Sequence, residues 1–341
     1  MNRFSQIEVE LDPAEITDDD LSARTRYLDD TSRSVISTNT SPDVGFDASL
    51  NPYRGCEHGC SYCYARPTHE YLGLTAGLDF ERVILVKRQA PALLQRALDA
   101  RGWTPKVLAL SGVTDPYQPV ERKLAITRGC LAVLARYRNP VGIITKNAMV
   151  TRDLDLLTEM AAWDGVRVTL SITTLDEGLR AALEPRTATI ANRLRAIAEL
   201  AAAGVPVGVN VAPIIPGLTD TEIPEILAAA AAAGARHAGY TVLRLPGAVG
   251  PLFEAWLDRH APGRKAKVLH RVREVHGGEA DDRRFGRRMR GEGTYAEQMR
   301  QLFHLARARA GIARTPEPLA TGHFRRSGAA EQASLFGVPA P

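Results

Sequence analysis

The chain has 341 residues, which is enough for a sizeable hydrophobic core in one large domain or two. Its 45% apolar and 24% charged residues are typical of a soluble globular protein, and no apolar run approaches the roughly 20 residues of a membrane-spanning helix. The N-terminus, MNRFSQIEVELDPAE, lacks the apolar core of a secretory signal peptide. We therefore expect a reducing, cytoplasmic location and no membrane association.

The net charge of +4 conceals an uneven distribution along the chain. Residues 259–314 contain about 15 Lys and Arg against 6 Asp and Glu, a net charge near +9, whereas residues 1–30 are acidic. A basic C-terminal third indicates an anionic partner, with nucleic acid as the first candidate. The alternative is a solvated, arginine-rich helix surface without such a partner.

Residues 1–45 are acidic and then rich in Ser and Thr, which predicts a poorly ordered or surface-draped extension. A first strand is expected at 46–51. It leads into NPYRGCEHGCSYC at residues 51–63, which contains a C-x3-C-x2-C spacing formed by Cys56, Cys60 and Cys63. The chain has one other cysteine, Cys130, in an apolar helical stretch, and we interpret it as a buried small apolar residue.

Three clustered cysteines do not fit a disulfide framework, which uses even numbers spread along a chain. Thiolates are ligands for soft metals and iron–sulfur clusters, and a four-iron cubane takes four ligands. Three cysteines would therefore leave one iron open for chemistry. The alternative is a structural zinc or iron–sulfur site, for which His58 and His69 are the nearest candidates as a fourth ligand.

Downstream of the cysteines, β-branched apolar runs alternate with helical patterns. The runs lie at residues 83–87, 106–111, 141–145, 167–172, 205–211 and 237–243. The helical patterns lie at residues 90–100, 126–137, 151–163, 189–204 and 222–234. This alternation predicts an α/β fold with a parallel sheet of six or seven βα units, fewer than the eight of a complete barrel.

Polar residues stand at the ends of successive predicted strands: Thr114 and Asp115 after the third, Lys146 after the fourth, Ser171 on the fifth and Asn210 on the sixth. In βα barrels the chemistry takes place at the C-terminal ends of the strands. A lysine or serine can hold a carboxylate, and an aspartate or threonine can accept from an ammonium group. We expect these residues to converge on one zwitterionic ligand, although each taken singly also fits a cap or turn.

The cysteine spacing, with the aromatic Tyr62 immediately before the third cysteine, resembles the signature of the radical SAM family. The resemblance implies that Cys56, Cys60 and Cys63 hold a [4Fe–4S] cluster. It implies that S-adenosylmethionine (SAM) chelates the open iron, with Tyr62 among the cofactor-binding residues. An electron from a flavodoxin- or ferredoxin-type donor would cleave SAM to a 5′-deoxyadenosyl radical, which abstracts a hydrogen atom from a substrate. The implied fold is a partial (β/α)6 TIM-type barrel.

Residues 51–247 resemble the spore photoproduct lyase group of that family, often labelled DNA-repair-photolyase-like. The resemblance rests on NPYRGCEHGCSYCYARPTHEYLG, TDPYQPVE, ITK and PIIPG, and on the later segment RFGRRMRGEG-TYAEQM. It implies that Thr114 and Asp115 face the amino group of SAM, that Lys146 and Ser171 face its carboxylate, and that Asn210 meets its ribose.

One departure concerns the hydrogen donor. In the lyase, by the resemblance, a cysteine that donates hydrogen to the product radical precedes the hydroxyl–Asp pair. Here that position is Val113, which has no thiol. Tyr64 and Tyr117 are candidates to relay a hydrogen atom. We therefore carry over the radical initiation step and not the reversal of a thymine-dimer lesion.

After a barrel at residues 46–247, a basic helical extension is expected at 248–311, with helical patterns at 252–260, 266–277 and 296–311. Between these patterns five arginines alternate with glycines: Arg283, Arg284, Arg287, Arg288 and Arg290. Arginine with flexible glycine suits nucleic-acid phosphates, and Phe285 or Tyr295 could stack on a base. The alternative is a loop that closes the open side of the barrel, its arginines pairing with the acidic N-terminus.

Residues 312–341 contain four Pro and no periodic pattern, which predicts a disordered tail. Within it, QASLF resembles the pentapeptide by which bacterial DNA-repair and replication proteins dock on the sliding clamp, with Gln332, Leu335 and Phe336 as the docking residues. A short apolar anchor on a flexible tail suits a preformed groove. The alternative is a tail without a partner.

These patterns and resemblances predict a radical SAM enzyme that acts on nucleic acid, in repair or modification. One alternative is radical modification of a protein or a small molecule. Another, from a different class, is a non-catalytic iron–sulfur binding or sensor protein.

Overall fold

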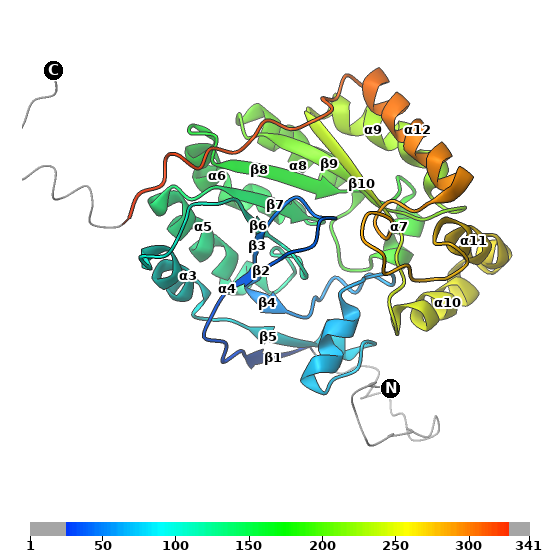
Figure 1. The fold of residues 1–341 in the computed structure, drawn as a ribbon, viewed down its shortest axis with the longest axis horizontal. Helices are drawn as coiled ribbons and strands as arrows, with labels where there is room; N and C mark the ends of the chain where they lie inside the picture. The colour runs from blue at the N-terminus through cyan, green and yellow to red at the C-terminus, as the bar shows by residue number, and fades with distance from the viewer. Residues whose placement is uncertain (1–24, 327–341) are drawn as a thin grey trace, which may run out of the picture.

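Six parallel strands form the main sheet of the protein, which a computed structural model describes over residues 25–326. These strands are β3 (Ala48–Leu50), β6 (Leu108–Leu110), β7 (Val141–Thr145), β8 (Val166–Ser171), β9 (Val207–Ile214) and β10 (His237–Val242). They lie side by side in chain order, and β2 (Ile36–Thr38) adds an antiparallel strand next to β3. Six parallel strands confirm the predicted partial barrel (Figure 1).

Helices alternate with the strands and share one hydrophobic core with the main sheet. The larger ones are α3 (Ala90–Asp99), α5 (Ile126–Tyr137), α6 (Leu154–Ala161), α8 (Ile190–Ala202) and α9 (Ile223–Ala232). The spacing of apolar residues explains this packing. Leu94 and Leu98 are four residues apart, so they share one face of α3, and both are fully buried. They belong to one core with the strand residues, and burying each such leucine stabilises the fold by about 1.5–3 kcal/mol.

The expected strand at 83–87 forms, but outside the main sheet. It is β5 (Val83–Val86), which lies between β1 (Arg26–Asp29) and β4 (Tyr53–Arg54) in a separate sheet of three strands. One of the strands predicted from the alternation of apolar runs and helical patterns, β5, is therefore not a strand of the barrel. Periodicity detects that a segment is a buried strand, whereas the choice of neighbours depends on backbone pairing with the distant residues of β1.

Short helices and the C-terminal helices complete the described chain. The short ones are η1 (Arg66–Leu72), α2 (Asp79–Arg82), α4 (Glu121–Leu124), η2 (Ala148–Asp153), α7 (Glu177–Leu183) and η3 (Asp220–Glu222). The C-terminal ones are α10 (Val249–His260), α11 (Pro262–Val275) and α12 (Gly293–Arg309). Within residues 25–326, no helix combines the length and the apolar composition needed to cross a membrane.

The two chain ends differ from the simple extension and tail that the sequence indicated. From residue 25 onward the N-terminal segment contributes β1 and β2, both mostly exposed. Residues 312–326, here called the C-terminal strap, run along the N-terminal ends of the strands (red in Figure 1). The strap is held largely through backbone atoms, such as Ala320 N to Asp164 O at 2.9 Å and Arg325 N to Tyr137 O at 2.9 Å. Such contacts leave no periodic signal in a sequence. The clamp residues Gln332, Leu335 and Phe336 lie outside the described residues.

The open side of the barrel is closed by residues 281–292, here called the arginine loop. On one edge Val242 N of β10 donates to Met289 O at 3.0 Å, and Arg290 Nη1 donates to Tyr240 O at 2.7 Å. On the other side Arg288 pairs with Asp43, which follows β2, and Gly286 N donates to Asp43 Oδ1 at 2.5 Å. The loop therefore joins the two edge regions of the sheet, as the alternative interpretation of this segment expected.

We expect Asp43→Asn to lower the free energy of unfolding by about 1–3 kcal/mol, because it removes a largely buried partner of Arg288. Burial raises the pKa of Asp43, but hydrogen bonds from Gly286 and Arg288 outweigh it and lower the pKa below 3.8. This stabilisation is therefore present above about pH 4 and is lost as the pH falls through the lower, folded pKa. Thermal unfolding of both proteins from pH 7 to pH 3 measures it.

The matched control is Arg300→Ala, which removes an exposed i,i+3 pair with Glu297 on α12 and should change stability by no more than about 0.5 kcal/mol. Equal effects of the two substitutions, or an Asp43→Asn effect that persists unchanged at pH 3, would contradict a closing role for the Asp43–Arg288 pair.

Candidate functional site

Residues 51–63, here called the cysteine loop, follow β3, include β4 and then fold into successive turns. The carbonyl of each cysteine accepts from an N–H three residues later: Gly59 N to Cys56 O at 3.4 Å, Cys63 N to Cys60 O at 3.2 Å, and Arg66 N to Cys63 O at 3.2 Å. Gly59 has a φ of 68°, and a Cβ at this position would lie 2.2 Å from Arg186 Nη2. The left-handed φ therefore favours glycine at this position, and the lack of a Cβ also leaves room for the Arg186 guanidinium.

Neighbouring segments hold the cysteine loop against the barrel. Cys56 N donates to Phe80 O at 2.9 Å and Ser61 N donates to Leu183 O at 2.9 Å. Arg66 Nε donates to Cys60 O at 3.0 Å, and its guanidinium pairs with Glu81 at 2.5 Å. These bonds fix the loop from both its flanks and from α7, so the three thiols occupy defined positions.

The donor chemistry of the loop fits an iron–sulfur cluster with three cysteine ligands. None of the four cysteines, all within the described residues, forms a disulfide. Burial raises the pKa of the Cys56, Cys60 and Cys63 thiols, and a buried thiolate requires a nearby cation such as a metal. In the described part of the chain no three His, Cys, Asp or Glu side chains could hold a single metal ion. A cubane is compatible with that finding, because each of its cysteines binds a different iron.

The side chains that might have supplied a fourth ligand are engaged elsewhere. Cys130 is fully buried in α5, as expected for a small apolar residue. His69 Nε2 lies 2.9 Å from Val83 O. His58 Nδ1 lies 3.4 Å from Asp115 Oδ2, and burial lowers the pKa of His58 although Asp115 opposes this shift. These contacts favour the cluster over the structural zinc site.

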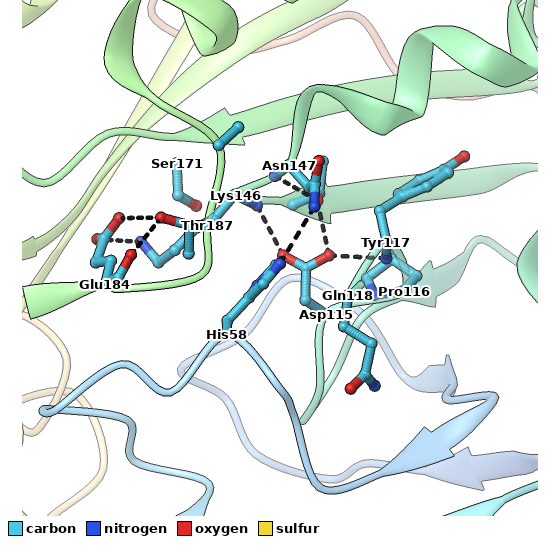
Figure 2. A network of polar contacts seen from close by, with 12 residues as sticks. His58, Asp115, Pro116, Tyr117, Gln118, Lys146, Asn147, Ser171, Glu184 and Thr187 are labelled. Carbon is cyan, nitrogen blue, oxygen red and sulfur yellow. Dashed lines mark hydrogen bonds and ion pairs between the residues drawn. The ribbon is translucent and has the colours of Figure 1, made fainter. Parts of the chain in front are cut away.

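Asp115 connects the cysteine loop to the ends of two strands. Its carboxylate accepts from Tyr117 N at 2.9 Å, from Thr145 Oγ1 at 2.7 Å and from Lys146 N at 2.7 Å, with His58 beside it. Figure 2 shows this carboxylate between His58 and the end of β7. Because both oxygens already accept from the protein, Asp115 holds these segments together, and its predicted contact with the SAM amino group stays a prediction.

Lys146 meets a buried polar cluster at the centre of the barrel. Its Nζ lies 2.7 Å from Ala212 O on β9, 3.3 Å from Glu184 Oε1 and 3.4 Å from Thr173 Oγ1, and 5.7 Å from the centre of the Tyr62 ring. The structure thus brings together two residues predicted from the sequence, Lys146 and Tyr62. They come from the end of β7 and from the cysteine loop.

Glu184 and Arg193 complete this cluster and were not predicted as site residues. Glu184 is fully buried and accepts from the Tyr62 hydroxyl and from Arg193 Nη2. Burial raises the pKa of Glu184, but the charges of Arg193 and Lys146 outweigh it and hold the pKa well below its ordinary value. The sequence showed Glu184 only as part of a polar segment after the fifth strand, which does not reveal burial.

The remaining predicted cofactor residues differ in their exposure and contacts. Ser171 ends β8, is buried and stands in register with Asn210 on β9. Asn210 is partly exposed. Thr114 is buried, and its hydroxyl donates to Tyr53 O at 3.0 Å, so this group is already used within the protein.

The two candidate tyrosines are separated. Tyr64 is 53% exposed, and its hydroxyl donates to Gly112 O at 2.9 Å, next to Val113, which is 38% exposed. Tyr117 is fully buried and donates to Asp153 Oδ2 at 3.1 Å. Its ring points away from Lys146 and Glu184 (Figure 2). The geometry thus places Tyr64, and not Tyr117, beside Val113, the position for which the resemblance implied a donor cysteine.

The five arginines predicted to contact nucleic acid all have partners within the protein. Arg284 pairs with Asp282 at 2.8 Å, Arg283 with Asp281 at 3.3 Å, and Arg287 with Glu292. Arg288 pairs with Asp43 and Arg290 with the Tyr240 carbonyl, as described above. Arg283, Arg284 and Arg287 are still 51–81% exposed, so their charges reach solvent although acidic neighbours reduce the net charge.

Comparisons with known proteins agree with this geometry. An uncharacterized protein of Mycobacterium tuberculosis (strain H37Rv) is 38% identical over 233 residues, which are 68% of this chain and 67% of the relative. A tyrosine-to-phenylalanine variant of spore photoproduct lyase superposes with a TM-score of 0.59 at 16% identity, covering 84% of this chain and 80% of the lyase. Spore photoproduct lyase complexed with dinucleoside spore photoproduct superposes with a TM-score of 0.52 at 17% identity, covering 69% of this chain and 67% of the lyase.

The two lyase structures share the fold of this chain. The family model of the radical SAM superfamily matches residues 50–230, which contain the cysteine loop, Asp115, Lys146 and Glu184. The match spans more than half of the sequence, from β3 to α9. This protein is therefore a member of the radical SAM superfamily.

Proposed function

We propose that this radical SAM enzyme holds a [4Fe–4S] cluster on Cys56, Cys60 and Cys63 and acts on nucleic acid, in repair or modification. The observation that carries the proposal is the placement of three free cysteines at the C-terminal end of the parallel sheet, beside Lys146. When bound, the cluster and SAM would supply a carbon-centred radical after reduction by a flavodoxin- or ferredoxin-type donor.

The protein's own residues would bind and orient SAM. Lys146, at 16% exposure, offers a positive charge for the SAM carboxylate, together with Ser171 at the end of β8. Glu184 keeps the Lys146 ammonium group next to Tyr62 by accepting from both. Asp115 fixes the backbone of Lys146 and so holds the end of β7 against the cysteine loop.

Nucleic acid is the proposed substrate class for two reasons. Spore photoproduct lyase, which shares this fold, has been solved with a dinucleoside spore photoproduct. The exposed guanidinium groups of the arginine loop suit phosphate contacts. Because Val113 has no thiol, the proposal does not include lesion reversal through a donor cysteine.

A second candidate function is modification of a protein or a small molecule. It is favoured by the pairing of the arginines of the arginine loop with acidic residues.

A sliding clamp is a further proposed partner, through Gln332, Leu335 and Phe336. Support for it comes from the QASLF sequence alone. Deleting residues 331–337 and measuring clamp retention would test it.

Reduced, cluster-loaded protein should cleave SAM to 5′-deoxyadenosine, and Cys60→Ala should abolish this activity because it removes one cluster ligand. Cys130→Ala serves as the control, since Cys130 lies in the hydrophobic core and should keep both the cluster and the activity. Chromatography of the nucleoside product, together with iron and sulfide content, measures the outcome. A full cluster without 5′-deoxyadenosine would instead indicate the sensor alternative.

Lys146→Ala should weaken SAM binding at least about tenfold, because a charge-assisted hydrogen bond contributes about 1.5–3 kcal/mol. Equilibrium dialysis with cluster-loaded protein measures the affinity. Lys123→Ala is the control, because Lys123 is an exposed lysine of the short helix α4. Equal SAM affinity of the Lys146 and Lys123 variants would remove Lys146 from the cofactor site.

Binding of a short single-stranded oligonucleotide should weaken steeply with salt. Replacing both Arg283 and Arg287 by Ala should make the plot of log binding constant against log salt concentration less steep by about one to two. Each phosphate contact contributes nearly one to the magnitude of that slope. These two are chosen because they are exposed, whereas Arg288 has a role in closing the barrel. Fluorescence anisotropy at several salt concentrations measures the slope, and binding that ignores salt would rule out the nucleic-acid proposal.

A further inference from the structure

A cavity of about 550 Å³ lies between the helix that follows the cysteine loop and the segment that follows β10. Pro67 and Tyr71 of η1 line one side of it, and Arg244, Pro246 and Gly247 line the other. Residues Asp281, Arg283 and Arg288 of the arginine loop form the remaining wall. A cavity of this size is large enough for a nucleotide-sized ligand.

Arg244 is the unusual residue of this cavity. Its side chain is only 17% exposed, and its Nε is buried with no hydrogen-bond partner among the described residues. Nη1 contacts the thioether of Met289 at 3.7 Å, and Nη2 lies 4.0 Å from Asp281 Oδ1, the outer limit of an ion pair. A guanidinium has five donors, so most of the hydrogen-bonding capacity of Arg244 is unused.

Two other buried arginines show what satisfied guanidinium groups look like in this protein. Arg193 donates to Ala188 O at 2.9 Å, to Ser171 O at 2.8 Å and to the Glu184 carboxylate. Arg66 donates to Cys60 O at 3.0 Å, to Gly77 O at 2.8 Å and to Glu81. Arg244 has no comparable set. Because a largely buried charge with only distant partners is costly, its presence in a cavity wall indicates a ligand that supplies closer ones.

The charges around Arg244 select an anion. The cavity wall contains three arginines and one aspartate. Arg288 is already bound to Asp43, and Arg283 Nε lies 3.3 Å from Asp281 Oδ2. Burial lowers the pKa of Arg244, and the positive charge of Arg288 lowers it further, so an anion would stabilise its charged form. Arg244 is two residues beyond the C-terminal end of β10, the same end at which the cysteine loop lies.

We propose that Arg244, assisted by Arg283 at the rim of the cavity, binds a phosphate group of the substrate. This inference rests on the proposed function, in which the substrate is a nucleic acid. The cavity borders η1, the helix that follows the cysteine loop, so a substrate bound there would lie near the three cysteines. A phosphate can offer close oxygens to both guanidinium groups, whereas Asp281 approaches Arg244 only to 4.0 Å. Tyr71, 71% exposed, stands at the same cavity and could stack on a base attached to that phosphate.

The test measures binding to unreduced, cluster-loaded, full-length protein, so that it does not depend on radical chemistry. The probes are fluorescent hexathymidylate, the same oligonucleotide with a neutral methylphosphonate backbone, and thymidine 5′-monophosphate and inorganic phosphate as competitors. Arg244→Gln should weaken hexathymidylate binding about tenfold, and Arg244→Lys should restore part of it. Arg195→Gln, at an exposed arginine of α8, is the matched control and should bind like the wild type.

The melting temperature of Arg244→Gln distinguishes loss of a ligand contact from misfolding of the variant. Without ligand, Arg244→Gln should melt within about 2 °C of the wild type or above it, because the arginine has few partners to lose. Inorganic phosphate should raise the melting temperature of the wild type more than that of Arg244→Gln. A clearly lower melting temperature of the variant, with no loss of phosphate stabilisation, would overturn the proposal in favour of a structural role.

The probes also identify the source of the phosphate. Competition by thymidine monophosphate as strong as that by the oligonucleotide supports the site but assigns it to a small phosphorylated substrate. Equal binding of the neutral and charged oligonucleotides, or no competition by either thymidine monophosphate or inorganic phosphate, would overturn phosphate recognition. Failure of this proposal and failure of the proposed function are distinguishable, because wild-type SAM cleavage is measured separately from oligonucleotide binding.

Discussion

The buried carboxylate of Glu184 is the interaction on which the site depends. A charge with no access to water must be balanced by the protein, and here the balance comes from Arg193 on α8 and Lys146 at the end of β7. Because Tyr62 also donates to Glu184, the same group attaches the cysteine loop to the barrel. Removing this one carboxylate would leave two buried or half-buried cations and one buried hydroxyl without their shared partner. The position of the cysteine loop is therefore coupled to the charge balance of the barrel interior.

The sequence predicted well those features that arise from local patterns. The helix expected at 126–137 forms as α5 with the same bounds, because its apolar residues recur at helical spacing. The six parallel strands and the grouping of the cysteines followed from alternation and spacing. Lys146 was expected at the cofactor site from its place at a strand end and Tyr62 from the family resemblance, and the structure places the two next to each other.

Other features could not be predicted, because they depend on contacts between distant segments. Nothing near Glu184 in the sequence shows that its carboxylate is buried, since that burial arises when α8, β7 and the cysteine loop meet. The assignment of β5 to a second sheet depends on its pairing with β1, more than 50 residues earlier in the chain. Arg244 looks like any other arginine after a strand. It is distinguished by the combination of a buried Nε without an acceptor among the described residues and a place in the wall of a cavity.

The C-terminal strap has a consequence for anything attached beyond residue 326. Starting from His237 at the beginning of β10, the strap passes Asp164 before β8 and Tyr137 before β7, and Arg326 contacts the carbonyls of Ala100 and Arg101. All these positions precede their strands, whereas the cysteine loop and the cavity at Arg244 lie where strands finish. Residue 326 and the cysteine loop are therefore at opposite poles of the barrel. A protein tethered beyond residue 326 would start from the pole opposite the cysteine loop and would leave the cavity at Arg244 uncovered.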